Sequence, residues 1–177
     1  MLIPCAKSTI DREAATRKLR GGLKRLGRAR FVGAFDFYIP YRRFGLQVTN
    51  RGQSAAYMLA VDSVVGDLDL WSLDAQTAGS GRVLINTDRY AMERLPEKRA
   101  VEVIIEKVKR QIYLKGFFKI RDLEVDAKFI ETFYIPYWVG VYQRNDSVRL
   151  DVVNGLNGVM EGVKLRDVVA DWFQRSG

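Results

Sequence analysis

The sequence contains no histidine and one cysteine, and these scarcities exclude several classes of catalytic and metal site. Without histidine the chain cannot form a Ser-His-Asp triad, a Cys-His pair or an H-E-x-x-H zinc site. Cys5 has no second cysteine with which to form an internal disulfide or a zinc-binding pair. The nearest carboxylate cluster, Asp67-Leu68-Asp69, is more typical of a solvated turn than of a magnesium site. We therefore expect no metal and no cofactor, and any enzyme chemistry would depend on carboxylates, lysine, tyrosine or backbone amides.

Long hydrophobic runs are also missing. The run FYIPYWVGVY has about half of the ~20 residues that a membrane-spanning helix needs. The N-terminal residues MLIPCAKSTI lack the apolar stretch of a signal peptide, and Asp11 and Glu13 soon follow. With 47% hydrophobic and 28% charged residues the composition is that of a globular protein. We expect a soluble, cytoplasmic protein without a transmembrane segment.

The net charge of +8 is concentrated near the N-terminus. Residues 1–30 hold nine basic side chains against Asp11 and Glu13, which gives +7. The remaining 147 residues hold 20 basic and 19 acidic side chains. The basicity is therefore a property of one segment of the chain.

That segment has the pattern of an amphipathic helix. Ser8, followed three residues later by Asp11, resembles a capping box. Gly21 and Gly22 each cost about 1 kcal/mol relative to alanine inside a helix, so the helix must gain stability by packing on a sheet. The apolar stripe that would pack consists of Ala15, Leu19, Leu23 and Leu26.

Basic side chains cover the opposite side of this helix. They can form the solvated face of a packed helix, or they can bind a phosphate backbone, an anionic membrane surface or an acidic protein. No helix-turn-helix, RNP-like or zinc-finger motif accompanies the charge, and the stripe lacks the aromatic anchors of a membrane-binding helix. The candidate contacts for an anionic partner are Arg17, Lys18, Lys24, Arg25, Arg28, Arg42 and Arg43.

The pentapeptide FYIPY occurs twice, at Phe37–Tyr41 and at Phe133–Tyr137. Each copy lies in a long aromatic and β-branched segment that follows a helical pattern and precedes a turn and a returning strand. The returning strands, residues 61–66 and 150–155, both have Asp at the second place and Gly at the sixth. The pentapeptides are 96 positions apart and the returning strands 89, so we expect the first hairpin to be about seven residues longer. The repeated order predicts an internal duplication.

Two further helices are predicted by apolar spacing. In the second half, Pro96 suits the first turn of a helix. A short amphipathic helix is expected to close the fold at the C-terminus, and residues between the copies read as a linker. The two apolar stripes are Val101, Ile104, Ile105, Val108 and Ile112, and Leu165, Val168, Val169 and Trp172.

Pro40 and Pro136 cannot donate to a β-ladder, so each is expected at a bulge, bend or edge of its strand. The flanking aromatic side chains can bury their rings while directing OH or NH groups to partners. Packing explains them sufficiently, although a ligand-binding groove between the copies is a second interpretation. The candidate groove residues are Tyr38, Tyr41, Tyr134, Tyr137 and Trp138.

Two resemblances rest on these motifs. The residues 61–66 and 150–155, an Asp-containing strand that runs into a glycine turn after a helix and a strand, resemble the PepSY type of module, although Val65 and Asn154 replace its usual Thr. The sequence Tyr134-Ile135-Pro136-Tyr137-Trp138, with Ile3-Pro4 and Ala14-Ala15, is similar to uncharacterised bacterial proteins that carry an N-terminal zinc ribbon. The zinc-ligand cysteines are absent, so no metal role is implied, and neither resemblance implies a catalytic residue.

The fold that we expect is α+β, with tandem duplicated helix–strand–strand units whose antiparallel sheets pack with helices about a pseudo-twofold axis. We expect one compact domain composed of a first repeat (1–73), a linker (74–95) and a second repeat with the C-terminal helix (96–177). The expected function is a non-enzymatic binding or scaffold module that engages a protein or an anionic surface. The alternatives are an enzyme with a carboxylate–tyrosine site, with Asp62 or Asp151 near a YIPY tyrosine, and a nucleic-acid-binding protein that uses the basic helix. The sequence leaves the oligomeric state open.

Overall fold

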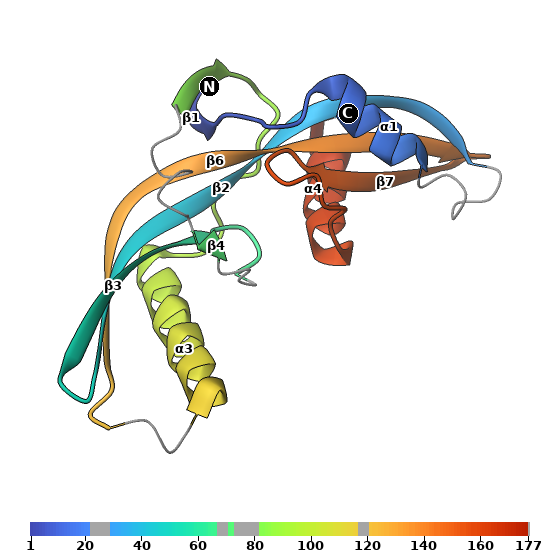
Figure 1. Ribbon diagram of the computed structural model, residues 1–177. Coiled ribbons are helices and arrows are strands. Elements are labelled where there is room, and N and C mark those ends of the chain that lie inside the picture. Colours follow the sequence, from blue (N-terminus) through green and yellow to red (C-terminus); the bar gives the residue numbers. More distant parts are fainter. Residues whose placement is uncertain (22–28, 67–70, 73–81, 117–120, 177) are drawn as a thin grey trace. The chain divides into compact units, whose positions relative to one another are not determined.

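The computed structural model describes residues 1–21, 29–66, 71–72, 82–116 and 121–176 (Figure 1). The chain divides into two compact units. Unit 1 comprises Met1–Pro40, Gly81–Met92 and Tyr134–Gly177, and unit 2 comprises Tyr41–Ser80 and Glu93–Phe133. Each unit thus takes residues from both expected repeats, and residues 82–92 of the expected linker belong to unit 1.

The α+β class is confirmed by three described helices and a seven-stranded sheet. Six strands follow the order β4-β3-β2-β6-β1-β5, and β7 pairs with β6. The sheet is mixed rather than purely antiparallel as expected, because β1 (Leu2–Ala6) pairs in parallel with β6 (Glu124–Arg144).

Unit 2 is built on the hairpin of β2 (Arg30–Asn50) and β3 (Gln53–Asp62). The two strands pair antiparallel from Tyr41↔Asp62 to Asn50↔Gln53, and β3 also pairs with β4 (Trp71–Ser72). Arg51 and Gly52 form the turn with positive φ angles of 55° and 72°. The turn that the sequence predicts between the first aromatic segment and its returning strand is confirmed here.

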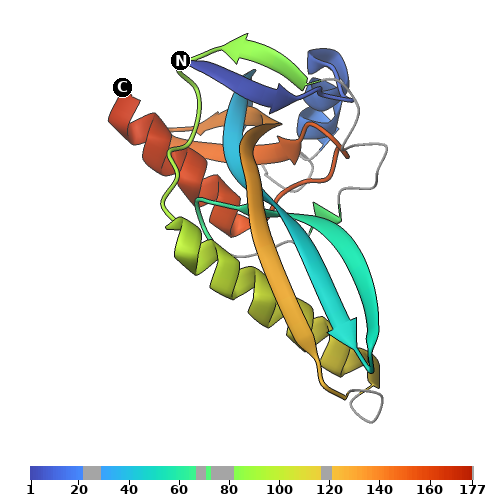
Figure 2. The same cartoon turned by 90° about the vertical axis from the view of Figure 1, so that its left-hand side faces the viewer.

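Helix α3 (Glu97–Gly116) covers this hairpin, and Figure 2 shows it running alongside the strands of unit 2. Its first turn follows Pro96, whose carbonyl oxygen accepts a 2.9 Å hydrogen bond from the Ala100 amide. The predicted apolar stripe of this helix faces the sheet, with Ile104 fully buried. The buried core of unit 2 consists of Phe44, Leu46, Val48, Val61, Ala100, Ile104, Val108 and Val125.

Unit 1 contains α1 (Arg12–Gly21), β1, β5 (Arg82–Asn86), β7 (Ser147–Asn154) and α4 (Val163–Ser176). β1 and β5 pair antiparallel, and β7 pairs antiparallel with β6. Both α1 and α4 pack with β7 (Figure 1). The C-terminal helix was predicted from its stripe, and Val168 and Val169 of α4 are buried as expected.

Helix α1 begins later than the expected capping box. Its cap is Asp11, whose Oδ1 accepts a 2.7 Å hydrogen bond from the Ala14 amide. The Ser8 hydroxyl instead donates to the carbonyls of Ile10 and Gly155, so the predicted Ser8 cap is wrong. The first half of the stripe is buried at Ala15 and Leu19. The second half, Leu23 and Leu26, lies outside the described residues, as do Lys24, Arg25 and Arg28.

Each proline of the repeated pentapeptide lies one residue beyond the end of a hairpin ladder. The β2–β3 ladder ends at Tyr41 and the β6–β7 ladder at Tyr137, and Pro40 and Pro136 come next along their strands. A residue without an N–H group loses no ladder hydrogen bond to its hairpin partner at that position. The same pentapeptides contain the unit boundaries, because β2 leaves unit 1 after Pro40 and β6 leaves unit 2 after Phe133.

Candidate functional site

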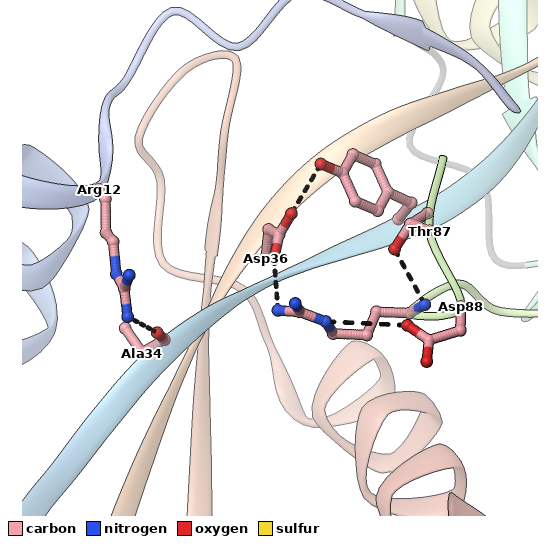
Figure 3. A network of polar contacts seen from close by, with 7 residues as sticks. Arg12, Ala34, Asp36, Thr87 and Asp88 are labelled. Carbon is pink, nitrogen blue, oxygen red and sulfur yellow. Dashed lines mark hydrogen bonds and ion pairs between the residues drawn. The ribbon is translucent and has the colours of Figure 1, made fainter. Parts of the chain in front are cut away.

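A polar network joins β2 to the residues that follow β5 (Figure 3). The carboxylate of Asp36 accepts a 2.8 Å hydrogen bond from the Tyr38 hydroxyl and a 2.6 Å contact from the Arg89 guanidinium. The Arg89 backbone amide donates to the Thr87 hydroxyl at 3.1 Å. The side chains of Arg89 and Asp36 remain 43% and 34% exposed, so the ion pair stabilises the fold only modestly. The network orders the chain between β5 and α3 against β2.

Tyr38 and Cys5 lie behind this network in a small core with Ile3 and Tyr134. Burial and then the nearby negative charge of Asp36 raise the pKa of the Cys5 thiol to about 12. Burial and the hydrogen bond to Asp36 also raise the pKa of Tyr38. Both groups therefore stay protonated near neutral pH. Because only the thiolate form of a cysteine is a good nucleophile, Cys5 is unreactive there. The arrangement suits packing and positioning better than proton transfer or nucleophilic attack.

The five candidate groove residues are mostly buried within their own units. Tyr38, Tyr41, Tyr134 and Tyr137 are each at most 8% exposed. The ring of Tyr134 packs edge-on against Tyr90 at 6.1 Å, and the ring of Tyr41 packs against Phe133 at 6.3 Å. Trp138 is half-buried, and its indole donates to the carbonyl of Ile10. These contacts match the packing interpretation, and the groove between the copies stays a prediction.

The residues before α1 and α3 are held in the same way. The carbonyl of Gly155 accepts hydrogen bonds from the amides of Thr9 and Ile10, at 3.0 and 3.2 Å. In unit 2, the carbonyl of Ser63 accepts hydrogen bonds from the amides of Arg94 and Leu95, at 2.8 and 2.9 Å. In each unit a single carbonyl just after the returning strand fixes the segment that leads into the helix.

A side chain that follows each pentapeptide completes this contact. The indole Nε1 of Trp138 donates to the Ile10 carbonyl at 3.2 Å, and the guanidinium of Arg42 donates to the Leu95 carbonyl at 2.7 Å. Arg42 also forms an ion pair with Glu93. Arg42 follows its pentapeptide as Trp138 follows the other, and it makes the corresponding contact to the segment before the helix.

The two aspartates expected near a YIPY tyrosine have structural partners. Asp62 lies directly across from Tyr41, and its Oδ1 accepts a 2.7 Å hydrogen bond from the Val64 amide in the turn that follows. Asp151 pairs with Arg166 at 3.3 Å and with Arg149 at 3.7 Å. Both carboxylates are buried, with 6% and 5% exposure of the residues.

The strand register also corrects the expected correspondence between Asp62 and Asp151. Tyr41 pairs with Asp62, whereas Tyr137 pairs with Asn154. Asn154 behaves like Asp62, because its Oδ1 accepts a 2.9 Å hydrogen bond from the amide two residues later. Each of the two turns then reaches a glycine of positive φ, Gly66 at 68° and Gly158 at 70°. The matching positions are 92 apart, so the expected seven-residue excess of the first hairpin is wrong.

The described basic candidates fall into two groups. Arg42 and Arg43 form ion pairs with Glu93 and Glu131, and their side chains are only 11% and 14% exposed. On α1, Arg17 is 73% exposed and lies 4.0 Å from Glu13. The Lys18 ammonium donates to the Gly158 carbonyl at 2.8 Å while the residue as a whole stays exposed.

A shallow hollow of about 400 Å³ lies on α1 and is lined by Arg12, Glu13, Thr16 and Arg17. Arg12, which lines the hollow, and Arg20 on the same helix both contact β2. The Arg12 guanidinium donates to the Ala34 carbonyl at 3.0 Å (Figure 3), and the Arg20 guanidinium lies 5.2 Å from the centre of the Phe31 ring. Sequence reasoning did not select Arg12 or Arg20, although both belong to the basic segment. It also missed Asp36, which the sequence marks as the one charged residue of the apolar stretch 31–41.

Within the described part of the chain, no group of three or more cysteine or carboxylate side chains could hold a metal ion. None of the described helices combines the length and the apolar character that a membrane crossing requires. Comparison of the chain with family models, curated proteins and solved structures gave no significant match. The functional hypothesis therefore depends on the geometry and charge of the chain itself.

Proposed function

We propose that this chain is a non-enzymatic binding module that engages an anionic partner through the exposed side of α1. The observation that carries the proposal is that the apolar side of this helix is buried while most of its basic side chains are exposed. Ala15 and Leu19 are fully buried, and the Tyr142 hydroxyl donates a 2.9 Å hydrogen bond to the Leu19 carbonyl. The apolar side thus fixes the helix, and the basic side is left for solvent or a partner.

The charge of the two units supports the choice of α1. Unit 1 contains sixteen basic and nine acidic residues, a net charge of +7, whereas unit 2 contains thirteen basic and twelve acidic residues. A surface with an excess of one sign attracts partners of the opposite sign and speeds their association. Arg42 and Arg43 are left out of the proposed surface, because Glu93 and Glu131 already neutralise them.

The non-enzymatic part of the proposal is supported by the state of the reactive side chains. Cys5 and Tyr38 are buried and have raised pKa values, while Asp62 and Asp151 are occupied by a turn and by two arginines. The enzyme alternative retains one observation in its favour, the 2.8 Å carboxylate–tyrosine pair of Asp36 and Tyr38. For catalysis near neutral pH, the pKa of Tyr38 would have to fall, because an acid or base is effective when its pKa lies near the working pH.

We further propose that the chain arose by duplication. Three sets of matched contacts support it: the paired amides on Ser63 and Gly155, the side-chain donors Arg42 and Trp138, and the capped turns at Asp62 and Asn154. A fourth match is the pair of isolated parallel contacts Cys5↔Tyr134 and Tyr38↔Tyr90. Under this proposal each unit joins the helix of one repeat to the hairpin of the other, since α3 packs on β2 and β3 while α1 packs with β7. The pseudo-twofold axis remains part of the proposal.

Retention on heparin tests the proposed surface. The double variant Arg17→Glu/Arg20→Glu should elute at clearly lower salt than the wild-type chain, because exposed charges of α1 are reversed. The control Lys98→Glu/Arg110→Glu makes the same change in net charge at exposed positions of α3. Equal elution of the two variants would show that total charge alone causes retention and would refute a specific role for α1.

A further inference from the structure

We infer that the anionic partner is the phosphate backbone of a nucleic acid, bound without recognition of base sequence. The inference rests on the proposed function and names the partner class. Arg12, Thr16 and Arg20 follow one another at intervals of four residues, so they form one row along the helix. Arg17 lies beside this row and lines the same hollow as Arg12 and Thr16.

The length of the row suits a polyphosphate better than a single phosphate. Eight residues separate Arg12 from Arg20, which corresponds to about 12 Å at 1.5 Å per residue. Each strand of duplex DNA carries one phosphate per about 3.4 Å of helix axis and also winds around that axis, so the row is long enough for more than one phosphate of the same strand. Both ends of the row can therefore contact the same backbone.

Arginine dominates this surface, and two of its members are held in place. Of the four basic residues of α1, three are arginines: Arg12, Arg17 and Arg20. Arg12 uses one N–H group on the Ala34 carbonyl, and Arg20 is held over Phe31 by its flat face. A guanidinium has five N–H donors and binds phosphate in a bidentate manner, so donors remain for a partner after these contacts. Side chains that are already ordered lose less entropy on binding.

The burial of the apolar side of α1 favours a nucleic acid over a lipid surface as the partner. Amphipathic helices bind membranes by inserting an apolar side beneath the headgroups. Leu19 is the one large apolar residue of α1, and it is fully buried beside Gly140, where an added Cβ atom would lie 2.9 Å from the leucine side chain. The helix would have to leave its unit to insert, so a membrane could attract it only through charge.

Glu13 provides a sharp test because it lines the hollow and lies 4.0 Å from Arg17. A carboxylate at this position repels phosphate. The variant Glu13→Gln should therefore bind nucleic acid more tightly, whereas Arg17→Gln should bind it less tightly. The two substitutions are adjacent on the same helix and exposed, so a general loss of folding cannot produce opposite effects.

The experiment measures the fluorescence anisotropy of a labelled mixed-sequence DNA duplex and of a labelled single-stranded RNA against the full chain. Binding should weaken linearly on logarithmic axes between about 50 and 200 mM salt, with a slope of about −0.9 for each phosphate contact on the duplex and about −0.7 on the single strand. The double variant Arg17→Gln/Arg20→Gln should reduce the magnitude of the slope for the duplex by about 1.8. The control Lys98→Gln/Arg110→Gln should leave it nearly unchanged. Two duplexes of unrelated sequence should bind equally.

Parallel measurements with phosphatidylglycerol vesicles and with polyglutamate identify the outcomes that overturn the inference. Tighter binding to vesicles would assign the surface to a membrane, and tighter binding to polyglutamate would assign it to an acidic protein. In both cases heparin retention through α1 would survive while the nucleic-acid inference would fail. Heparin retention that does not depend on the charges of α1 would refute the proposed function as well. An unchanged salt slope in Arg17→Gln/Arg20→Gln would refute the inference directly.

Discussion

Arg42 and Trp138 follow the two FYIPY copies, and each donates a side-chain N–H to the carbonyl two residues before a helix. The two side chains share neither charge nor shape. What they share is a donor at the end of a long side chain, so the contact and not the residue type is repeated. The energetic role of this contact can be tested by substitution.

The first prediction exchanges the donor of unit 2. In a Glu93→Gln background, which removes the ion-pair partner of Arg42, Arg42→Trp should be more stable than Arg42→Phe by about 1 kcal/mol. The reason is that only tryptophan can donate to the Leu95 carbonyl, and one neutral hydrogen bond contributes about that much. Urea unfolding of both variants provides the comparison. If the phenylalanine variant is equally stable, the contact has no energetic role.

The second prediction concerns the close approach of two backbones at Gly155. A Cβ atom at this residue would lie 2.5 Å from the Pro136 carbonyl oxygen, to which the Gly155 amide donates at 2.8 Å. Because backbone must move, Gly155→Ala should destabilise the chain by about 2–4 kcal/mol. The matched control is Gly162→Ala, where an added Cβ atom meets nothing within 4 Å. Thermal unfolding of the two variants should differ widely, and similar melting temperatures would contradict the described contact.

The third prediction follows from the raised pKa of Cys5. Its usual value is 9.0 and burial raises it to about 12, so the folded chain keeps a proton that the unfolded chain releases. The stabilisation by this group is complete below pH 9.0 and is lost as the pH rises towards about 12. The free energy of unfolding should fall by up to about 1.4 kcal/mol per pH unit in this window.

The variant Cys5→Ala isolates the contribution of the thiol. Burial and the negative charge of Asp151 raise the pKa of Tyr142 from 10.0 to about 12. Ionisation of Tyr142 therefore also lowers the free energy of unfolding as the pH rises, but this loss begins at a higher pH than that from Cys5. Between pH 9.0 and about 10 the alanine variant should therefore show the flatter dependence in urea unfolding. Identical slopes for both proteins would show that Cys5 ionises equally in the folded and unfolded states.

The fourth prediction addresses the buried carboxylate of Asp151. Arg166 on α4 is its nearer arginine, and removing it in Arg166→Met should cost about 1–3 kcal/mol, because Arg149 at 3.7 Å compensates only in part. The double variant Asp151→Asn/Arg166→Met should recover some of this loss, since it no longer buries a poorly paired charge. Urea unfolding measures both. A double variant less stable than the single one would mean that Asp151 has another essential role.

The sequence predicted local features of the fold better than its long-range contacts. The stripes of α3 and α4 and the turn at Arg51-Gly52 were found because a helical period and turn residues are local signals. The capping residue of α1 was predicted incorrectly, because Ser8 is drawn to the Gly155 carbonyl, 147 positions away in the chain. Local spacing cannot report such a partner.

The candidate site shows the same limit. Arg42 and Arg43 were selected for their charge, and nothing near them in sequence announces Glu93 and Glu131. The correspondence of Asp62 with Asp151 was chosen on residue identity, whereas the register pairs Asn154 with Tyr137, and its side-chain oxygen also accepts a hydrogen bond from the turn that follows. A side-chain oxygen is what the turn requires, and a letter-by-letter match does not detect that equivalence.

The arrangement of chain segments also determines the order in which the protein can be completed during synthesis. Unit 2 ends at Phe133, while unit 1 needs Met1–Pro40 together with residues up to the C-terminal helix. The basic helix α1 precedes β7 in the chain, so it cannot pack on this strand until residues 147–154 have been translated. Until then its apolar side has no permanent cover, and a nascent-chain chaperone or a nucleic acid would meet an unfinished unit whose charges are already present.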